Sequence, residues 1–420
     1  MTKYHDWTKI LPNDGKGLKR MMKKTLRLMM IFLLFLSFKA FSGTLNTGPW
    51  RFELKTTHSV IPFILEFSKN KNKYEASLQN GKEIIPLKDI QVNGNQISIP
   101  IQTYEMSLEL ELLKDGLLSG ALVRHNKNPK VKTPVSGNFG ISERFAEKKQ
   151  KSEINLSGRW AISMLDEQEQ SGTGVLLFEQ KGDLIHGSIL TPTGDYRYFE
   201  GYVSGNEFEA ASFDGVYNYL LKGKVKDGKL SAQILSSYKT IIEGKKDETA
   251  ELPDAYKQTQ LDRLSFSFPD LQGKFIQLES PQFKNKPIIV QFFGSWCPNC
   301  LDEMNYLIPW YKTRKQKKIE IIALAFERSN TKEEAKKQLL KTKKKYQIPY
   351  TLLIAGSTSD DKPKDKIPGL KNFISFPTTL FLNKNHEIIK IHAGFTGPST
   401  GVFFERWKKE FNQTVEEMVK

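Results

Sequence analysis

The sequence contains few cysteines and no hydrophobic run long enough to cross a membrane. Only 2 of its 420 residues are cysteine, which excludes a small scaffold held by several disulfides and zinc clusters built from cysteine. The most apolar run, Leu28–Phe38, has eleven residues, whereas a bilayer-spanning helix needs about 20. Disorder throughout is also excluded, because 39% of the residues are hydrophobic and 11% are aromatic. A chain of this length and composition is predicted to form more than one domain.

The surplus of positive charge lies near the two ends of the chain. There are 63 Lys and Arg residues against 47 Asp and Glu residues, a formal net charge of +16. Residues 1–42 contribute +7, residues 43–265 contribute −1 and residues 266–420 contribute +10. A basic chain of this kind can bind nucleic acid, so the nature of its two basic segments decides what the charge means.

The first basic segment has the pattern of a secretory signal. Five basic residues between positions 19 and 27 precede the apolar run Leu28–Phe38. Small residues at Ala40 and Ser42 suit cleavage before Gly43. Residues 1–42 are therefore predicted to direct export, and the mature protein to be periplasmic or otherwise extracytoplasmic.

Two alternatives to a simple cleaved signal remain open at the sequence level. The polar stretch 1–20 is long for such a signal, so Met21 or Met22 is an alternative start. The same apolar run can also act as an uncleaved N-terminal membrane anchor. In either case no cysteine lies directly after the run, which excludes lipoprotein anchoring. Export argues against a nucleic-acid partner, and none is predicted.

The chain after the leader has the pattern of short antiparallel strands. Runs such as Gln96–Ile101 and Met106–Leu112 alternate apolar and polar residues, as half-buried strands do. Tight-turn dipeptides separate such runs, at Asn80-Gly81, Asn93-Gly94, Asp115-Gly116 and Asp227-Gly228. This region is predicted to be all β.

The β region also contains an internal repeat with a spacing near 111 residues. Trp50 recurs as Trp160, and Phe67 recurs as Phe178. The segment 92–97 matches 203–208, and 114–119 matches 226–231. We expect two halves, 47–126 and 156–244, of roughly six antiparallel strands each, forming one barrel-like assembly or two sandwiches. Residues between the halves read as a polar connection, and nothing in this region identifies a ligand.

The pattern changes after a polar linker at residues 245–263. From residue 264 to residue 420, buried apolar runs alternate with helical segments, which predicts an α/β sheet with strands in both directions. The expected strands are Ile288–Phe293, Ile319–Phe326, Thr351–Ala355, Thr378–Leu382 and Glu387–His392. The expected helices follow the first strand as far as Lys315, then span Thr331–Tyr346 and Thr400–Val419.

Both cysteines of the chain lie in one Cys297-Pro298-Asn299-Cys300 segment at the start of a predicted helix. Two side chains at this spacing lie about one helical turn apart and can form a disulfide. The helix N-terminus stabilises the thiolate of Cys297, while Cys300 suits the role of resolving thiol. Pro298 fits the first helical turn, where its missing N–H is not needed. A metal half-site and an inert disulfide are the alternatives, and the redox-active pair is favoured.

Three motifs in residues 264–420 resemble the thioredoxin-like proteins of the TlpA/ResA type. The motifs are Phe268-Pro269-Asp270-Leu271-x-Gly273, Val290-x-Phe292-Phe293-Gly294-Ser295-Trp296-Cys297-Pro298-x-Cys300 and Phe376-Pro377-Thr378-Thr379. The resemblance implies a thioredoxin fold for this region and a cis peptide bond before Pro377, facing the cysteines. It also implies that the backbone of Phe376 pairs with a bound polypeptide, and that Trp296 shapes the docking surface.

Glu303 matches the acidic residue of the family three positions after the second cysteine. It is expected to exchange protons with the dithiol, with an ordinary solvated helix glutamate as the alternative. Classical thioredoxins carry a buried Asp where this chain has Gln291, which favours Glu303 as the acid. The sequence also departs from the family pattern at Asn299, where a second proline is usual, and at Asn305, where the helix proline is usual.

The predicted function is that of an exported thiol–disulfide oxidoreductase, a reductase of protein disulfides in the cell envelope. It would use a Cys297/Cys300 dithiol–disulfide cycle, with no cofactor or metal and with a membrane protein as electron donor. The alternative is an extracytoplasmic binding module, or a Cu(I)-handling protein in which the two thiols are soft ligands. Overall, the predicted fold class is a duplicated antiparallel β region followed by a thioredoxin-like α/β domain.

Overall fold

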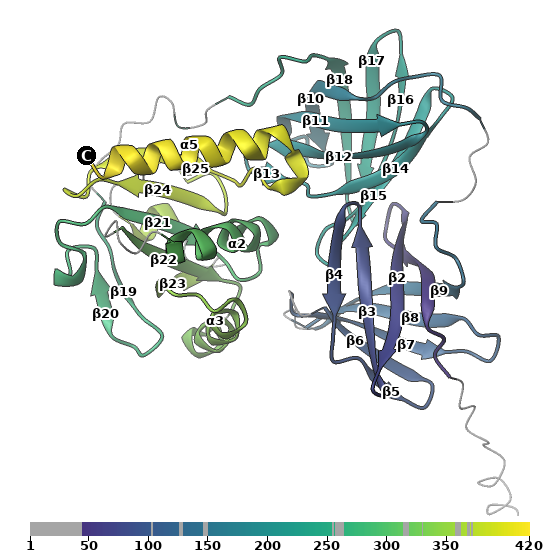
Figure 1. Cartoon of the computed structure of the whole chain (residues 1–420), viewed down its shortest axis with the longest axis horizontal. Coiled ribbons are helices and arrows are strands. Elements are labelled where there is room, and N and C mark those ends of the chain that lie inside the picture. The colour runs from purple at the N-terminus through teal and green to yellow at the C-terminus, as the bar shows by residue number, and fades with distance from the viewer. Residues whose placement is uncertain are drawn as a thin grey trace, which may run out of the picture.

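The computed structural model describes residues 44–101, 104–125, 129–145, 150–253, 256, 264–313, 319–329, 331–357, 363–367, 370 and 373–420. The predicted signal at 1–42 lies outside these residues, as do residues 254, 255 and 257–263 of the predicted linker. Within the described ranges, no helix is both long enough and apolar enough to cross a membrane. Two large β-sheets precede an α/β domain, and α5 of that domain lies beside the second sheet (Figure 1).

The first sheet, called barrel 1 below, has nine strands in the order β4-β3-β2-β1-β9-β8-β7-β6-β5. Strands that are neighbours in both the sheet and the chain pair antiparallel, as β1 and β2 do. β1 also pairs antiparallel with β9. The sheet is open between β4 and β5. The strands are β1 (Gly48–Lys55), β2 (Val60–Asn70), β3 (Lys73–Asn80), β4 (Glu83–Leu87), β5 (Gln91–Asn93), β6 (Gln96–Ile101), β7 (Met106–Leu112), β8 (Leu118–Arg124) and β9 (Val131–Phe139).

The second sheet, barrel 2, also has nine strands, in the order β11-β10-β18-β17-β16-β15-β14-β12-β13. An additional pairing of β11 with β12 closes this sheet into a barrel. The strands are β10 (Gly158–Asp166), β11 (Ser171–Lys181), β12 (Leu184–Thr191), β13 (Gly194–Asp195), β14 (Phe199–Ser204), β15 (Glu207–Phe213), β16 (Asn218–Lys226), β17 (Lys229–Leu235) and β18 (Lys239–Lys246). β18 therefore extends two residues into the predicted linker.

The two barrels repeat the same local structure around their tryptophans. The indole N–H of Trp50 donates to the carbonyl of Asn46, and that of Trp160 donates to the carbonyl of Leu156, each at 3.0 Å. Both indoles are buried in the cores of their barrels. The repeated residues therefore fill equivalent positions in two similar folds.

The expectation of roughly six strands in each half is wrong, because each sheet has nine. β9 (Val131–Phe139) accounts for part of the difference, since it lies within the stretch expected to connect the halves. Only Val135 and Gly137 of this strand are buried, so it lacks a clear apolar alternation. It is nevertheless held between β1 and β8, which shows that backbone pairing rather than an apolar face keeps it in the sheet.

The barrels share part of one hydrophobic core. The ring of Phe213, in β15, stacks on Phe63, in β2, with ring centroids 3.9 Å apart. The backbone N–H of Phe213 donates to the side-chain oxygen of Asn80 at 3.0 Å. The buried Arg144 donates to the carbonyl of Ala211 at 2.9 Å. Barrel 1 is thus completed by side chains of barrel 2.

The C-terminal domain has a five-stranded sheet in the order β23-β22-β21-β24-β25. β21, β22 and β23 run parallel to one another, whereas β24 pairs antiparallel with both of its neighbours, β21 and β25. This confirms the predicted α/β sheet of mixed direction. The elements are β19 (Ser267–Pro269), β20 (Phe275–Gln277), η1 (Pro281–Phe283), β21 (Ile288–Phe293), α2 (Pro298–Thr313), β22 (Glu320–Glu327), α3 (Lys332–Tyr346), β23 (Thr351–Ser357), α4 (Pro363–Lys366), β24 (Thr378–Leu382), β25 (Ile388–Ala393), η3 (Pro398–Thr400) and α5 (Val402–Met418).

Local sequence signals account for the elements that carry the site. All six residues of β21 are buried, as the continuous apolar run predicted. Thr331 is the N-cap of α3, and its side chain accepts a hydrogen bond from the backbone N–H of Glu334 at 3.1 Å. α2 continues through Pro309 to Thr313.

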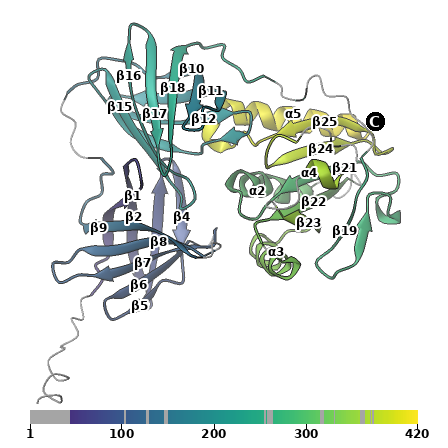
Figure 2. The ribbon, with the colours of Figure 1, turned by 180° about the vertical axis from the view of Figure 1, so that it is seen from behind.

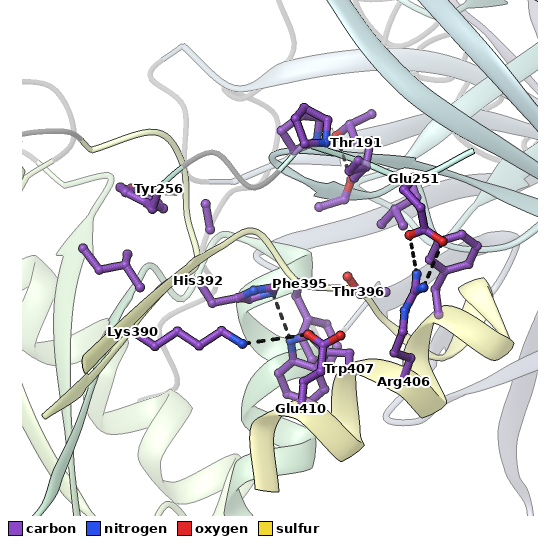
Figure 3. Close-up of a pocket in the computed structure, with 18 residues that line it drawn as sticks. Thr191, Glu251, Tyr256, Lys390, His392, Phe395, Thr396, Arg406, Trp407 and Glu410 are labelled. Atoms are coloured by element: carbon purple, nitrogen blue, oxygen red, sulfur yellow. Dashed lines mark hydrogen bonds and ion pairs between the residues drawn. The ribbon is translucent and has the colours of Figure 1, made fainter. Parts of the chain in front are cut away.

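Ion pairs fasten α5 to barrel 2. Arg406 of α5 binds Glu251 through two hydrogen bonds of 2.9 and 2.6 Å, and Arg159 of barrel 2 binds the same carboxylate at 3.0 Å. Beside them is a cavity of about 290 Å³ between barrel 2, β25 and α5 (Figure 3). In it, the indole N–H of Trp407 donates to His392 at 3.0 Å. From behind, the α/β domain lies beside both barrels (Figure 2).

Candidate active site

The two cysteines lie where β21 leads into α2. The backbone N–H of Cys300 donates to the sulfur of Cys297 at 3.3 Å. The thiol of Cys297 also lies 3.5 Å from the carbonyl oxygen of Phe376. Both cysteines are free thiols. This arrangement stabilises negative charge on Cys297, because a backbone N–H at the start of a helix points at its sulfur.

The two thiols differ in how readily they ionise. Cys300 is fully buried, and burial raises the pKa of its thiol well above the ordinary value. The hydrogen bond with Cys297 and the negative charges of Cys297 and Glu303 raise this pKa further. Burial therefore favours the protonated form of the Cys300 thiol. The roles of Cys297 as attacking sulfur and Cys300 as resolving sulfur stay predictions.

The cis-proline loop lies opposite the dithiol. The peptide bond between Phe376 and Pro377 is cis, as the family resemblance implied. The ring of Phe376 packs edge-on against Trp296, with centroids 5.6 Å apart. The indole N–H of Trp296 donates to the carbonyl of Phe326 at 2.9 Å. The predicted residues Trp296, Phe376 and Pro377 thus meet Cys297 at one place.

Glu303 is buried behind the dithiol rather than solvated. None of its surface is exposed, and its two oxygens accept hydrogen bonds from Gln291 at 2.6 Å and Thr379 at 2.8 Å. Burial raises the pKa of this carboxyl to about 7, and the two hydrogen bonds oppose that rise. The alternative of an ordinary solvated glutamate is therefore wrong. Gln291, at the position of the classical aspartate, donates to the acid that α2 supplies.

A second buried acid that the sequence analysis missed lies at the end of β22. Glu327 accepts hydrogen bonds from the backbone N–H and the hydroxyl of Ser295, at 2.9 and 2.7 Å. Burial raises the pKa of Glu327 to about 7. Its carboxylate fixes the turn that precedes Trp296 and Cys297. The only sequence signal was a charged residue at the end of an apolar strand.

Asn299 explains one departure from the family pattern. Its side-chain amide donates to the carbonyl of Asp195 at 3.2 Å, and its side-chain oxygen accepts from the hydroxyl of Tyr217 at the same distance. Asp195 is the last residue of β13, and Tyr217 lies in the loop between β15 and β16, so both partners belong to barrel 2. Burial, followed by the nearby Cys297 sulfur, raises the pKa of Tyr217 well above the ordinary value, so its hydroxyl remains a donor. A second proline in place of Asn299 would make neither contact.

A buried ion cluster joins all three parts of the molecule close to the dithiol. Arg197, in the loop between β13 and β14, pairs with Asp214 of barrel 2 at 3.1 Å. It also pairs with Asp302 of α2 at 3.0 Å and with Glu83 of barrel 1. Burial raises the pKa of Asp302 to about 7, although Arg197 opposes this. We call these four residues the Arg197 cluster.

Barrel 2 thereby covers the cysteines. Only 5% of Cys297 is exposed, and Cys300 is not exposed. Asp195 adds to the cover, because its carboxylate accepts from the backbone N–H of Gly397 at 2.6 Å and from the hydroxyl of Ser399 at 3.1 Å. The sequence analysis predicted the chemistry of the site but not its enclosure, which depends on how distant loops meet.

A metal centre has little support from the described residues. They contain no group of three or more His, Cys, Asp or Glu side chains that could hold a metal ion. Cys297 and Cys300 are the soft donors at the site.

The same region of the chain is similar to known redox proteins. The family model named Redoxin matches residues 257–401. The thiol-disulfide oxidoreductase ResA of Bacillus cereus (strain ZK / E33L) is 30% identical over 126 residues, which are 30% of this chain and 64% of that protein. ResA of Halalkalibacterium halodurans is 28% identical over 131 residues, 31% of this chain and 66% of that protein. The chain thus spans somewhat less than two thirds of these relatives.

A solved structure also aligns with this region. It is a thiol:disulfide interchange protein of the thioredoxin family from Chlorobium tepidum TLS, with 19% identity and a TM-score of 0.30. The alignment covers 39% of this chain and 99% of that one. The Redoxin match begins at residue 257 and so lies outside the two barrels.

Proposed function

We propose that this protein is an exported thiol–disulfide oxidoreductase. The premise is that residues 257–401 form a Redoxin-family domain similar to the ResA thiol–disulfide oxidoreductases. The observation that carries the proposal is the asymmetry of the cysteine pair. Cys297 receives the N–H of Cys300 on its sulfur, whereas the Cys300 thiol is held protonated by burial.

The reaction follows from this asymmetry. The Cys297 thiolate attacks one sulfur of a substrate disulfide, forms a mixed disulfide and releases the other substrate sulfur as a thiolate. Cys300 loses its proton and attacks Cys297, which releases the second substrate thiol. The two electrons pass to the substrate, and the protein is left with a Cys297–Cys300 disulfide.

The proposed direction is reduction of disulfides in the cell envelope, with a membrane protein returning two electrons to Cys297 and Cys300. The similarity to ResA proteins supports thiol–disulfide exchange, and the leader at 1–42 supports export. Protein disulfides are the proposed substrates. The carbonyl of Phe376 lies within reach of Cys297 and is placed to meet a bound polypeptide.

The reduction potential of the cysteine pair tests the direction of the reaction. We expect a potential at the reducing end of the range for such proteins, which runs from about −270 mV to about −120 mV. Equilibration of the full chain with glutathione or dithiothreitol buffers, followed by alkylation and mass measurement, gives this value. A potential near the oxidising end would overturn the reductase assignment and leave disulfide exchange itself in place.

Glu303 is proposed to accept the proton that Cys300 loses. Replacing it by glutamine keeps its size and both hydrogen-bond partners but removes the proton acceptor. We expect Glu303→Gln to slow the resolving step by about 100-fold at pH 7 and to flatten the pH dependence near pH 7. Stopped-flow tryptophan fluorescence during oxidation measures this step. The control is Glu417→Gln, which changes an exposed residue of α5.

The stability of the same variant checks that the mutation acts as intended. Because the folded-state pKa of Glu303 is raised to about 7, from an ordinary value of 4.5, its contribution is full below pH 4.5 and is lost as pH rises through 7. Glu303→Gln should therefore be more stable than the wild type at pH 8 and similar to it at pH 4. A variant less stable at pH 8 would show that the carboxylate is structural.

A further inference from the structure

A cleft beside Trp296 is not used by the proposed mechanism. It has a volume of about 500 Å³ and lies where barrel 1, barrel 2 and the α/β domain meet. Tyr104 and Arg124 line it from barrel 1, and Val216 lines it from barrel 2. Trp296 and Arg328 line it from the α/β domain. A cavity of this size accommodates a small molecule.

Two arginines from different domains face this cleft. Arg124 ends β8 of barrel 1, and Arg328 directly follows β22. Among the described residues, no acidic side chain forms an ion pair with either guanidinium. Burial lowers the pKa of Arg328 and the positive charge of Arg124 lowers it further, while the nearby Cys297 sulfur and the carboxyl of Glu327 oppose this. The two cations therefore lie close enough to repel each other, which an anion between them would relieve.

Three acidic residues also line the cleft, and two of them are engaged by other groups. Glu105 of barrel 1 pairs with Lys341 of α3 at 3.2 Å, and this pair bridges the two domains. Glu327 is held by Ser295 at 2.9 and 2.7 Å. The third acid is Glu334 of α3. The lining therefore carries one more basic residue than acidic residues, since Arg124, Arg328, Lys337 and Lys341 face these three acids.

Arg328 is placed to hold an anion close to the reacting sulfur. Its guanidinium carbon lies 3.7 Å from the centre of the Trp296 ring, so the ring supports the flat face of the cation. The edge of a guanidinium stacked in this way keeps its donors for a carboxylate. Trp296, which lines the cleft, is the neighbour of Cys297 in the chain, whereas Cys297 itself is not among the lining residues.

The enclosure of the site favours a small ligand over a folded protein. Cys297 is only 5% exposed, and Asn299 is bound to Asp195 and Tyr217 of barrel 2. A protein substrate can reach the sulfur only if the barrels move away. A small disulfide is smaller than a protein and can enter the cleft that Val216 and Trp296 line.

We propose that this cleft binds a low-molecular-weight disulfide that carries carboxylates, with Arg124 and Arg328 as the residues that recognise its negative charge. The proposal rests on the proposed thiol–disulfide exchange and names a second substrate class for it. Cys297 attacks one sulfur of the bound disulfide and expels one small thiolate. Cys300 then attacks Cys297 and releases the second small thiol, so that the two electrons of the dithiol reduce one disulfide.

The test compares three small disulfides of different charge. Oxidised glutathione is negatively charged, bis(2-hydroxyethyl) disulfide is uncharged and cystamine is positively charged at pH 7. The full chain is first reduced and freed of reductant, and the second-order rate of its oxidation by each probe is followed by tryptophan fluorescence. The same probes are reacted with dithiothreitol to correct for their intrinsic reactivity.

The corrected rates are expected to fall from the negative to the neutral to the positive probe. Electrostatic attraction of this kind is expected to change rates by about tenfold or more. In Arg124→Gln and Arg328→Gln, the ratio of the rates with oxidised glutathione and with the uncharged probe should fall towards one. Arg328→Lys should retain part of the ratio, and Lys229→Gln, at the exposed start of β17 in barrel 2, should leave it unchanged.

The outcomes separate this proposal from the proposed function. If none of the three probes oxidises the dithiol and insulin is not reduced either, the proposed function fails. If the uncharged probe reacts but the rates do not follow charge, or the arginine variants keep the wild-type ratio, only the cleft proposal fails. A clear preference for an acidic peptide disulfide over oxidised glutathione would also overturn it, because the occupant would then be a polypeptide.

Discussion

Replacing Cys300 with serine is expected to leave Cys297 covalently joined to its substrate. The first exchange needs only the Cys297 thiolate, whereas release of the product needs the Cys300 sulfur. The serine hydroxyl can still fill the buried space but cannot attack the mixed disulfide. Turnover should therefore fall below ~1% of the wild-type rate while adducts accumulate.

The adducts are measured by non-reducing electrophoresis and mass spectrometry of the full chain recovered from the cell envelope. Treatment with dithiothreitol should release the trapped proteins and small thiols, which identifies both proposed substrate classes. Cys297→Ser is the matched control, and it should form no adducts. A Cys300→Ser protein without adducts would contradict the assignment of Cys297 as the attacking sulfur.

Arg197→Met is expected to have the largest effect on stability. The change removes the cation that lies among Asp214, Asp302 and Glu83 and leaves their charges buried together. Burial alone would lower the pKa of Arg197, but the surrounding acids outweigh it and raise that pKa, so the residue is always charged. Breaking a buried ion pair in this way costs about 3–5 kcal/mol of folding free energy.

Urea unfolding measures the loss of stability, and alkylation of Cys297 by iodoacetamide measures the loss of its cover. Both should change together in Arg197→Met, because the cluster connects barrel 2 to α2. Arg406→Met is the control, since its partly exposed pair with Glu251 should contribute only about 0–1 kcal/mol. Lowered stability with an unchanged alkylation rate would show that the cluster does not hold the cover in place.

A partial rescue sharpens this test. Adding Asp302→Asn to Arg197→Met removes one of the acids that has lost its partner, so part of the lost stability should return. The rescue should be larger at pH 8 than at pH 5. Burial raises the pKa of Asp302, and loss of the opposing Arg197 raises it further, so the cost of keeping this acid in the folded state grows as pH rises.

Sequence reasoning located the redox site because its signals are local. The buried run of β21, the CxxC spacing and the Phe376-Pro377 motif each lie within a short stretch of chain, and each has the expected structure. Glu303 was identified from its position in the helix, but its burial was not. Burial of Glu303 depends on Gln291 and Thr379. Gln291 lies in β21, before α2 in the chain, and Thr379 lies in β24, after it.

The features that sequence reasoning missed all depend on contacts between distant segments. Asn299 looks like an unexplained departure from a family pattern until its partners Asp195 and Tyr217 are known. Arg197 lies in an unremarkable loop, with nothing nearby in sequence to indicate Asp302. No periodicity or spacing reports which loops of a β-barrel meet a separate domain, so the cover over the dithiol could not have been predicted.

The stacking of Phe213 on Phe63 sets an order for folding. Phe213 is 133 residues after its hydrogen-bond partner Asn80, yet both belong to the region where barrel 1 receives side chains of barrel 2. When the chain is made from its N-terminus, all strands of barrel 1 are synthesised before the residues of barrel 2 that complete its core. Until Phe213 is made, Phe63 stacks only on Phe52 of its own barrel, and its other face stays without that partner. The two halves, alike in architecture, are therefore successive steps of a single folding event.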